Sequence, residues 1–353
     1  MTRLRFSALR GPLAACALLF LGACAPEGDA YGGEGAVDER PLFPDLAQFS
    51  GLPDDPLEGA SSDFWEWWGD GRAELSGYRL TLGRYGEPRE AELALIYVTE
   101  PHDRRTWIKD DDVQSPHRVE MLKLISSVKF LTGIYPYSVM TSTFAPVDRY
   151  REQAFSPVRI AHSVQEWCGS YSQTLWPGPE GFRSLRLSYF AHEGERVREV
   201  DAQGELVYED ALLIQLRELD GAFAGGGDWE GLLVPELWRF RTRHAGTDPV
   251  PAHIQREEAV REDPVLGEVP VTRFTLSTDD YMRTFDVERE EPRRVLGWTT
   301  SLGDEASLLA TERLDYWRLN RLGDEAYREA LGLSPLAAVP PSTAPGSAGG
   351  CPE

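Results

Sequence analysis

The sequence has few cysteines and few positive charges relative to its negative ones. Its 353 residues include 4 Cys, and 36 Lys and Arg stand against 58 Asp and Glu, a net charge of −22. A chain this acidic is repelled by DNA, RNA and anionic lipid headgroups, which argues against nucleic acid as a partner. A neutral or apolar ligand in a pocket stays possible. With 41% hydrophobic residues and 10 Trp, the chain has enough apolar material for a packed core.

The short sequence motifs of common catalytic and metal-binding sites are also missing. The six His show no HxH or HExxH spacing, and the acidic run 110–112 lacks the alternating ligands of an EF-hand. There is no Gly-x-Ser-x-Gly, no GxGxxG and no P-loop. On one strand, His162 and Cys168 would lie roughly 20 Å apart, too far for a nucleophile and its base. We therefore expect no cofactor, no metal site and no nucleotide chemistry; weak binding of Ca²⁺ at the acidic surface is the alternative for the metal.

The N-terminus has the features of an export signal. Three Arg precede an apolar run over 12–21, and small residues lead directly to Cys24. The word Leu-Gly-Ala-Cys resembles a bacterial lipobox, which implies cleavage after residue 23 and lipidation of Cys24. An ordinary signal peptide cut nearby is the alternative, and Cys16 fits the same pattern with almost no apolar run before it. The run is shorter than the about 20 residues of a spanning helix. We expect an exported protein anchored to the membrane by lipid, and Ala25 resembles the outer-membrane sorting pattern of some bacteria.

The rest of the chain divides by composition. Residues 24–60 are rich in Gly, Pro, Asp and Glu and read as a flexible tether spanning roughly 30–35 Å; docking of its apolar 42–49 stretch on the domain is the alternative. Residues 61–333 form a β-rich domain, with a candidate division into two lobes at the Gly-rich stretch 221–228. Residues 334–353 read as a disordered tail. Cys168 is expected to be buried and unreactive, and a Cys168–Cys351 bridge is the alternative.

Period-two alternation predicts a mainly β protein, with a central strand over 93–98 that is covered on both faces. Because so many strands must curl or split to protect their edges, we expect a large curved antiparallel sheet, a half-open barrel or two packed sheets, with a few short helices. Helices are predicted over 64–68, 208–219 and 324–331. The predicted strands are 73–83, 93–98, 122–130, 133–144, 158–167, 170–176, 182–191, 232–242, 254–261, 271–277, 281–288, 294–301 and 306–317.

Two groups of side chains are candidates for binding. Phe64, Trp67 and Trp68 share one face of the first helix, either as a plug over one end of the sheet or as an exposed platform. The second group combines polar and aromatic residues, either as the polar end of a pocket in the mouth of the sheet or as its outward polar side. We expect a Lys129 contact with Glu166 or Glu100, because a buried charge needs a partner. The group consists of Tyr85, Glu100, Lys129, Tyr135, Tyr137, Gln165, Glu166 and Trp167.

Several short sequence motifs, which follow one another along the chain, resemble those of an uncharacterised family of bacterial secreted proteins and lipoproteins. Some of its members carry the label of a septum formation inhibitor, which belongs to a nucleotide pyrophosphatase family with a Ser-x-Ser-Pro-Arg-Arg word. Here only Glu-Pro-Arg-Arg occurs, at 291–294, so the resemblance implies boundaries, about 64–333, but no activity. The shared words are Ala73-Glu74-Leu75, Arg84-Tyr85-Gly86-Glu87, Val98-Thr99-Glu100, Thr132-Gly133-Ile134-Tyr135-Pro136-Tyr137-Ser138, Gln165-Glu166-Trp167-Cys168-Gly169 and Leu296-Gly297-Trp298.

Three functions are then open as hypotheses. The first is a non-enzymatic lipoprotein of the cell envelope that binds a hydrophobic or amphipathic ligand, or a partner protein, in or on its curved sheet; the architecture is similar to that of LolA-type carriers. The second is a hydrolase of envelope glycan or lipid that uses Glu100 and Glu166 as paired carboxylates. The third is a structural assembly lipoprotein, which an exposed apolar patch would favour.

Overall fold

The computed structural model describes residues 42–46, 48, 62–147, 155–202, 206–219, 227–244, 246–263 and 266–334. The predicted signal with Cys24, most of the predicted tether, Cys351 and nearly all of the predicted tail lie outside these residues. The chain divides into two compact units, 1–44 and 45–353, and the strands and helices from Ser62 onward all belong to the second. Within the described residues, no helix has both the length and the apolar character needed to cross a membrane.

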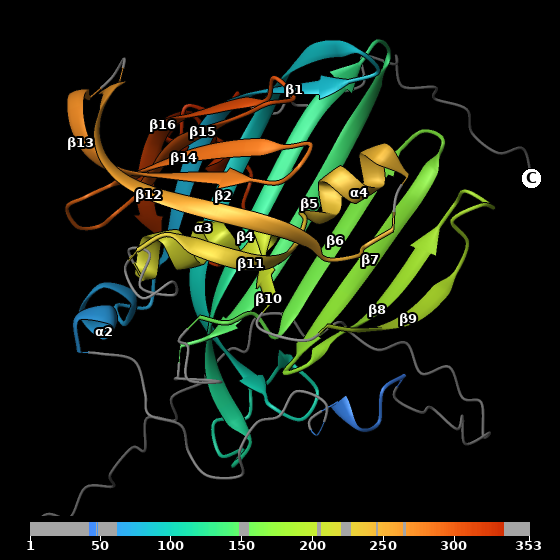
Figure 1. Cartoon of the computed structure of the whole chain (residues 1–353). Helices are drawn as coiled ribbons and strands as arrows, with labels where there is room; N and C mark the ends of the chain where they lie inside the picture. Colours follow the sequence, from blue (N-terminus) through green and yellow to red (C-terminus); the bar gives the residue numbers. More distant parts are fainter. Residues whose placement is uncertain are drawn as a thin grey trace, which may run out of the picture. The chain divides into compact units, whose positions relative to one another are not determined.

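The second unit is built on one open sheet, as the period-two pattern predicts (Figure 1). One meander runs from β1 to β9 and the other from β10 to β16, and they are joined where β1 pairs with β16. Neighbouring strands are antiparallel, except β10 and β11. The strands are β1 Ala73–Arg84, β2 Glu87–Asp103, β3 Ile108–Lys109, β4 Arg118–Thr132, β5 Tyr135–Pro146, β6 Arg159–Glu166, β7 Gly169–Gly178, β8 Gly181–Ser188, β9 Arg196–Asp201, β10 Leu206–Tyr208, β11 Trp229–Val234, β12 Val250–Asp263, β13 Gly267–Ser277, β14 Met282–Glu288, β15 Val295–Thr300 and β16 Glu305–Leu314.

Short helices complete the unit. From Ser62 onward, the helices among the described residues are α2 Ser62–Trp68, α3 Glu209–Glu218, α4 Leu237–Arg243, α5 Tyr327–Ala330 and the 3₁₀ turns η2 Tyr316–Arg318 and η3 Asp324–Ala326. Figure 1 shows α3 near β11 and α4 over the strands β5 and β6; Arg241 of α4 also lies 5.4 Å from the Tyr171 ring of β7. All the strands belong to one sheet, and the predicted division into two lobes falls mostly on residues that the structure does not describe.

The prediction of a strand over 232–242 is confirmed for 232–234 and wrong for the rest. The strand β11 ends at Val234, directly before Pro235, which has no N–H to donate to a ladder. The chain then forms α4, in which Leu237 and Phe240, three residues apart, share a buried face. Apolar and charged residues alternate in Leu-Trp-Arg-Phe-Arg, and this alternation imitates a strand.

The strand β2 is covered on both faces, as its continuous apolar run predicts. Leu93, Leu95 and Tyr97 face the main core. On the other face, Val98 packs in a second cluster with Leu331 and Leu333 from the C-terminal segment. We call the sheet face that carries the main core the inner face, and the opposite one the outer face.

The helix α2 serves as a plug, the favoured interpretation of its aromatic cluster. Phe64 and Trp68 are buried, and the Trp68 ring lies 6.1 Å from that of Tyr97 on β2. The prediction that Trp67 shares their buried face is wrong, because its side chain is 37% exposed. The guanidinium of Arg313 lies 4.7 Å from the centre of the Trp67 ring and fixes it at the surface.

The helix α3 is the centre of the unit and is buried on nearly every side. Its main chain accepts hydrogen bonds from the hydroxyls of Tyr97 on β2, at 3.0 Å, and Thr143 on β5, at 3.1 Å. Near its end, Arg217 forms an ion pair with Glu74 of β1, and both side chains are almost fully buried. A helix without a solvent-facing side depends on such contacts with the surrounding sheet.

We expect the Arg217–Glu74 pair to behave as a unit. Arg217→Met leaves the Glu74 carboxylate buried without its partner and should lower the free energy of unfolding by about 3–5 kcal/mol. The double variant Arg217→Met/Glu74→Leu should lose less than the single one, because no charge of the pair is then left unpaired. Urea unfolding monitored by circular dichroism measures both.

The control is an ion pair at the surface, Arg289–Glu258, whose side chains are 44% and 60% exposed. Arg289→Met should change the free energy of unfolding by less than about 1 kcal/mol. A loss at Arg217 no larger than that at Arg289 would contradict the role of the buried pair.

Candidate ligand-binding site

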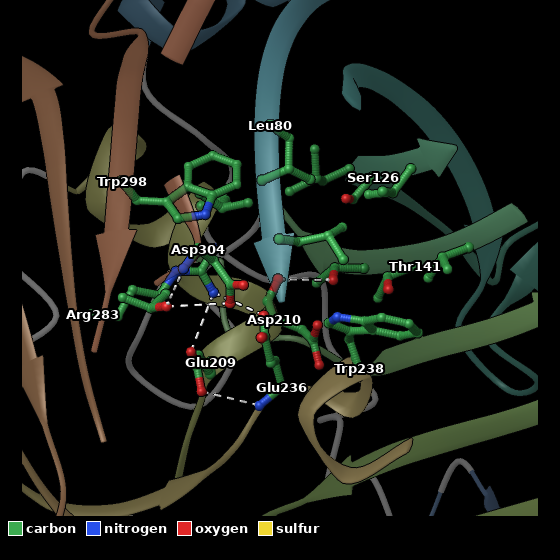
Figure 2. Close-up of a pocket in the computed structure, with 17 residues that line it drawn as sticks. Leu80, Ser126, Thr141, Glu209, Asp210, Glu236, Trp238, Arg283, Trp298 and Asp304 are labelled. Atoms are coloured by element: carbon green, nitrogen blue, oxygen red, sulfur yellow. Dashed lines mark hydrogen bonds and ion pairs between the residues drawn. The ribbon is translucent and has the colours of Figure 1, made fainter. Parts of the chain in front are cut away.

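A cavity of about 90 Å³ lies between the inner face of the sheet and the starts of α3 and α4 (Figure 2). One wall is apolar and comes from both meanders. Half-buried lining residues such as Val128, Thr141 and Trp238 connect the cavity with solvent. The apolar lining consists of Leu80, Leu82, Leu124, Val128, Val139, Leu213, Trp238 and Trp298.

The opposite end of the cavity is lined by carboxyl groups, because two helices begin there with acidic residues. The first residues of α3 are Glu209 and Asp210, and Glu236 directly precedes α4. The Glu209 carboxylate accepts a hydrogen bond from the N–H of Glu236 at 3.1 Å, and that of Asp210 accepts one from the N–H of Leu237 at 3.0 Å. Acidic groups at a helix start satisfy its free N–H groups and its dipole. The acids of α3 thus cap α4.

Cations compensate these carboxyls unequally. Glu209 lies 3.3 Å from Arg239 and 3.2 Å from Arg283, and it accepts a hydrogen bond from the Tyr281 hydroxyl at 3.2 Å. Arg283 also donates to Glu236 at 2.8 Å. The Asp210 carboxyl is bound by a main-chain N–H instead, and it forms no ion pair with any residue that the structure describes. Negative groups therefore outnumber positive ones at this end of the cavity.

The excess of carboxyls changes their protonation. Burial, followed by the neighbouring Glu236 carboxylate, raises the pKa of Asp210 to about 8. Burial raises the pKa of Glu236 to about 7, although Arg283 acts in the opposite direction. At neutral pH Asp210 therefore holds a proton and is able to donate a hydrogen bond. Asp304 instead accepts bonds from the Gly83 N–H at 2.8 Å and the Thr300 hydroxyl at 3.2 Å.

Four of the predicted site residues meet at the hairpin end of the first meander. We call them the hairpin aromatic cluster: Tyr85 lies in the β1–β2 turn, Tyr135 and Tyr137 lie at the start of β5, and Trp167 lies in the β6–β7 turn. The hydroxyls of Tyr85 and Tyr137 lie 2.8 Å apart, and the rings of Tyr135 and Trp167 stack at 6.1 Å. Tyr85 and Trp167 are 57% and 68% exposed.

Trp238 connects this cluster with the cavity. Its ring lies 6.4 Å from that of Tyr137 and also lines the cavity. Tyr85 has a positive φ of 56°, and Gly86 follows it with 78°, as in a tight hairpin turn. A bulky residue rarely takes this conformation, so the turn holds the Tyr85 ring at the cluster against a backbone preference.

Three other predicted site residues lie on the outer face, as in the alternative interpretation of the group. Lys129 and Gln165 are exposed there, each paired in register with Ser138. Glu100 does not contact Lys129; it binds Lys123 at 3.1 Å and His102 at 2.8 Å. The predicted contact of Lys129 with Glu100 or Glu166 is not among the ion pairs of the described residues.

The positions of Glu100 and Glu166 do not suit a pair of catalytic carboxylates. Glu100 pairs with Met121, eight residues along β4 from Lys129, so it shares the outer face with Gln165. Glu166 follows Gln165 and faces the other way. Along the strands, Glu100 and Glu166 are also nine residues apart, which corresponds to roughly 30 Å. Glycoside hydrolysis requires two carboxyls that flank the scissile bond and lie no more than about 10 Å apart.

The prediction that Cys168 is buried is wrong. It lies exposed in the β6–β7 turn as a free thiol, and Cys351 is outside the described residues. The main-chain N–H of Cys168 donates to the Glu166 carboxylate at 2.7 Å. A hydrogen bond with Glu166, together with its negative charge, raises the pKa of the Cys168 thiol, which disfavours the nucleophilic thiolate.

Sequence reasoning did not identify Glu209, Asp210, Glu236 or Arg283. In the sequence, Glu209 and Asp210 are visible only as two acidic residues at the start of a predicted helix. Such residues usually cap the helix, so they do not by themselves indicate a binding site. Their partners lie up to 74 residues away on β14, a separation that no local pattern reports.

The chain matches no protein-family model, no curated protein and no solved structure. Its own residues are therefore the basis on which a function is inferred.

The raised pKa of Asp210 predicts that this residue lowers the free energy of unfolding by an amount that depends on pH. In the unfolded chain this carboxyl loses its proton near pH 4, whereas the folded protein retains it up to about pH 8. Stability contributed by Asp210 is thus lost as the pH rises from 4 to 8. Relative to the wild type, Asp210→Asn should gain stability across this window, by at most about 1.4 kcal/mol per pH unit, with no further gain above it.

Urea unfolding at pH 4.5, 6, 7 and 8.5 measures the difference. The control, Glu262→Gln, changes an exposed carboxyl of β12 and should give a small difference. A difference for Asp210→Asn that is the same at all four pH values would refute the raised pKa.

Proposed function

We propose that the protein is an exported lipoprotein, anchored in the outer membrane through Cys24, that binds an amphipathic ligand in its curved sheet without reacting with it. The observation that carries this proposal is the cavity, which has an apolar wall, carboxyl groups at one end and an aromatic cluster beside it. The lipobox resemblance, and that to a family of secreted proteins and lipoproteins, support the location.

The size of the cavity limits what enters it. Its volume of about 90 Å³ corresponds to about three water molecules in the liquid, whereas pockets for drug-sized ligands measure about 300–1,000 Å³. The polar end of the ligand fills the cavity, and its longer apolar part lies along Trp238 and the hairpin aromatic cluster. Tyr85 and Trp167 present rings to solvent there.

The polar end is a hydrogen-bond donor. Glu236 and Asp304 offer carboxylate oxygens to the cavity, and Arg283 is already engaged by Glu209 and Glu236. An ammonium or hydroxyl head group finds acceptors here. A carboxylate or phosphate head group meets an excess of negative charge, which opposes its entry.

A second candidate function is suggested by the raised pKa values of Asp210 and Glu236. Carboxyls that change protonation between pH 7 and 8 in one cavity are suited to general acid and base catalysis. In this function, protonated Asp210 donates a proton to the bound ligand and ionised Glu236 accepts one. It replaces the hydrolase based on Glu100 and Glu166.

The binding proposal predicts that filling the cavity prevents ligand uptake. The lipid-anchored chain is purified in detergent, mixed with dodecylamine, dodecanol or dodecanoate, and measured by native mass spectrometry. We expect adducts with the amine and the alcohol, and none with the carboxylate. Val128→Phe, on the inner face, should reduce these adducts at least tenfold because the new ring occupies the cavity.

Lys129→Phe is the matched control, since it adds the same ring one residue away on the exposed outer face. It should bind like the wild type. Equal binding by the two variants, or a preference for dodecanoate, would overturn the proposed site.

The two candidate functions differ in what happens to the natural ligand. We expect solvent extraction of protein from its own cell envelope to return one ligand species, unchanged after incubation with added protein. If instead the protein converts it to a product, and Asp210→Asn retains binding but loses that conversion, the catalytic function is correct.

A further inference from the structure

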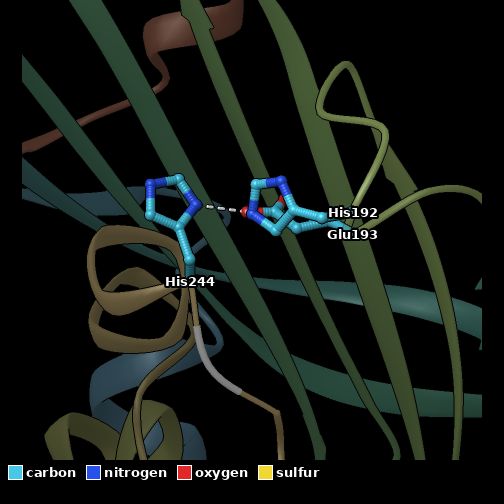
Figure 3. A group of neighbouring side chains, drawn as sticks. All are labelled: His192, Glu193 and His244. Atoms are coloured by element: carbon cyan, nitrogen blue, oxygen red, sulfur yellow. Dashed lines mark hydrogen bonds and ion pairs between the residues drawn. The ribbon is translucent and has the colours of Figure 1, made fainter.

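Two histidines and a glutamate meet where the β8–β9 connection approaches the end of α4 (Figure 3). His192 and Glu193 belong to the connection, and His244 is the residue that ends α4. Their ligand atoms all lie within 4.8 Å of one another. Nδ1 of His244 contacts Oε1 of Glu193, and Nε2 of His192 lies 3.7 Å from the same oxygen. Figure 3 shows both imidazoles directed toward the carboxylate.

We propose that His192, Glu193 and His244 form a binding site for Zn²⁺, with solvent completing the coordination. Two imidazole nitrogens and a carboxylate oxygen are ligands that zinc prefers, and three protein ligands with an open position are a common zinc arrangement. Zinc bonds of about 2.0–2.2 Å place tetrahedral ligand atoms about 3.4 Å apart. The exposed imidazoles reach this spacing by moving on the order of 1 Å.

Contacts behind the ligands hold the carboxylate in place. Glu193 is only 4% exposed, and the hydroxyl of Ser188 donates to its second oxygen. The N–H groups of Glu193 and Gly194 both donate to the carbonyl of Phe190, at 3.0 and 2.9 Å, so a tight turn fixes the segment. Such secondary hydrogen bonds orient a metal ligand before the ion binds.

His244 ends α4 with φ 53° and ψ 36°, a left-handed conformation that Gly or Asn most often takes at a helix end and that His adopts more readily than most other side chains. The Phe190 ring packs beside both imidazoles, 6.0 Å from the ring of His192 and 5.4 Å from that of His244, and the two imidazole rings lie 5.5 Å apart.

One nearby charge opposes a cation. The guanidinium of Arg241 lies 4.9 Å from the Phe190 ring and interacts with Glu193. Its positive charge repels the ion. We therefore expect weaker zinc binding than in sites built from cysteine thiolates.

The experiment uses the full chain in detergent, freed of metal by chelation and titrated with zinc chloride alone. Isothermal titration calorimetry should show one ion per chain, and zinc should raise the thermal unfolding midpoint. Cobalt chloride should give the visible absorption of a low-coordinate Co²⁺ site. His192→Ala, at a side chain that is 64% exposed, should fold normally and bind zinc at least tenfold more weakly.

His244→Asn removes the other imidazole with a residue that tolerates the left-handed conformation, and it should weaken binding to a similar extent. The control is His253→Ala on β12, which removes a histidine outside the group; it should bind like the wild type. The proposal is overturned if the wild type does not bind zinc, if both variants retain its affinity, or if calcium chloride has the same effect. The last two results would mean that zinc binds to the acidic surface in general.

Discussion

The structure depends on the neutralisation of charges that α3 carries into the interior of the sheet. A buried charge without a partner is costly, and this helix contains two fully buried ones, Glu209 and Arg217. Arg217 finds Glu74 on β1, while Glu209 finds Arg283 on β14 and Arg239 on α4. Each pairing fixes an element against the helix, and together they hold strands of both meanders around it. The sheet therefore has to curve around α3 in order to bring the partners of these buried charges to the helix.

The need to neutralise buried charges also explains why the candidate binding site lies at the N-terminal end of α3. Arg217 neutralises Glu74 at the C-terminal end of the helix. At the N-terminal end, Glu209 and Glu236 share the nearby arginines, and Asp210 has no ion pair among the described residues. An apolar residue at position 210 would avoid this cost. A carboxyl that lowers stability while facing a cavity is typical of functional sites, where stability and function conflict.

Periodicity was sufficient to predict the sheet and insufficient to predict the cavity. Alternation at Tyr78, Leu80 and Leu82 predicted β1 and its inner face, because a strand exposes alternate residues whatever its partners. It failed at α4, where apolar and charged residues alternate but Pro235 and helix packing decide the structure. The proximity of the residues in the hairpin aromatic cluster could be predicted from the sequence, because hairpins bring the ends of neighbouring strands together.

Other parts of the site depend on contacts that sequence does not encode locally. Arg283 reaches Glu209 across 74 residues because the second meander returns over α3. Lys129 and Gln165 share a strand neighbour yet lie on the outer face, away from the cavity. Polar side chains on a solvent-facing side of a sheet are ordinary, so the polarity of Lys129 and Gln165 is no evidence of a binding site.

The short helix α4 links the parts of the molecule that have chemical interest. Seven residues are too few for a stable isolated helix, so contacts at its two ends determine its position. At its start, Glu209 and Asp210 accept hydrogen bonds from the N–H groups of Glu236 and Leu237, and at its end His244 contacts Glu193. Trp238, the second residue of the helix, lines the cavity and also contacts Tyr137 of the hairpin aromatic cluster. The shape of the cavity therefore depends on charged contacts at both ends of this helix, one of which involves a carboxyl that changes its protonation near neutral pH.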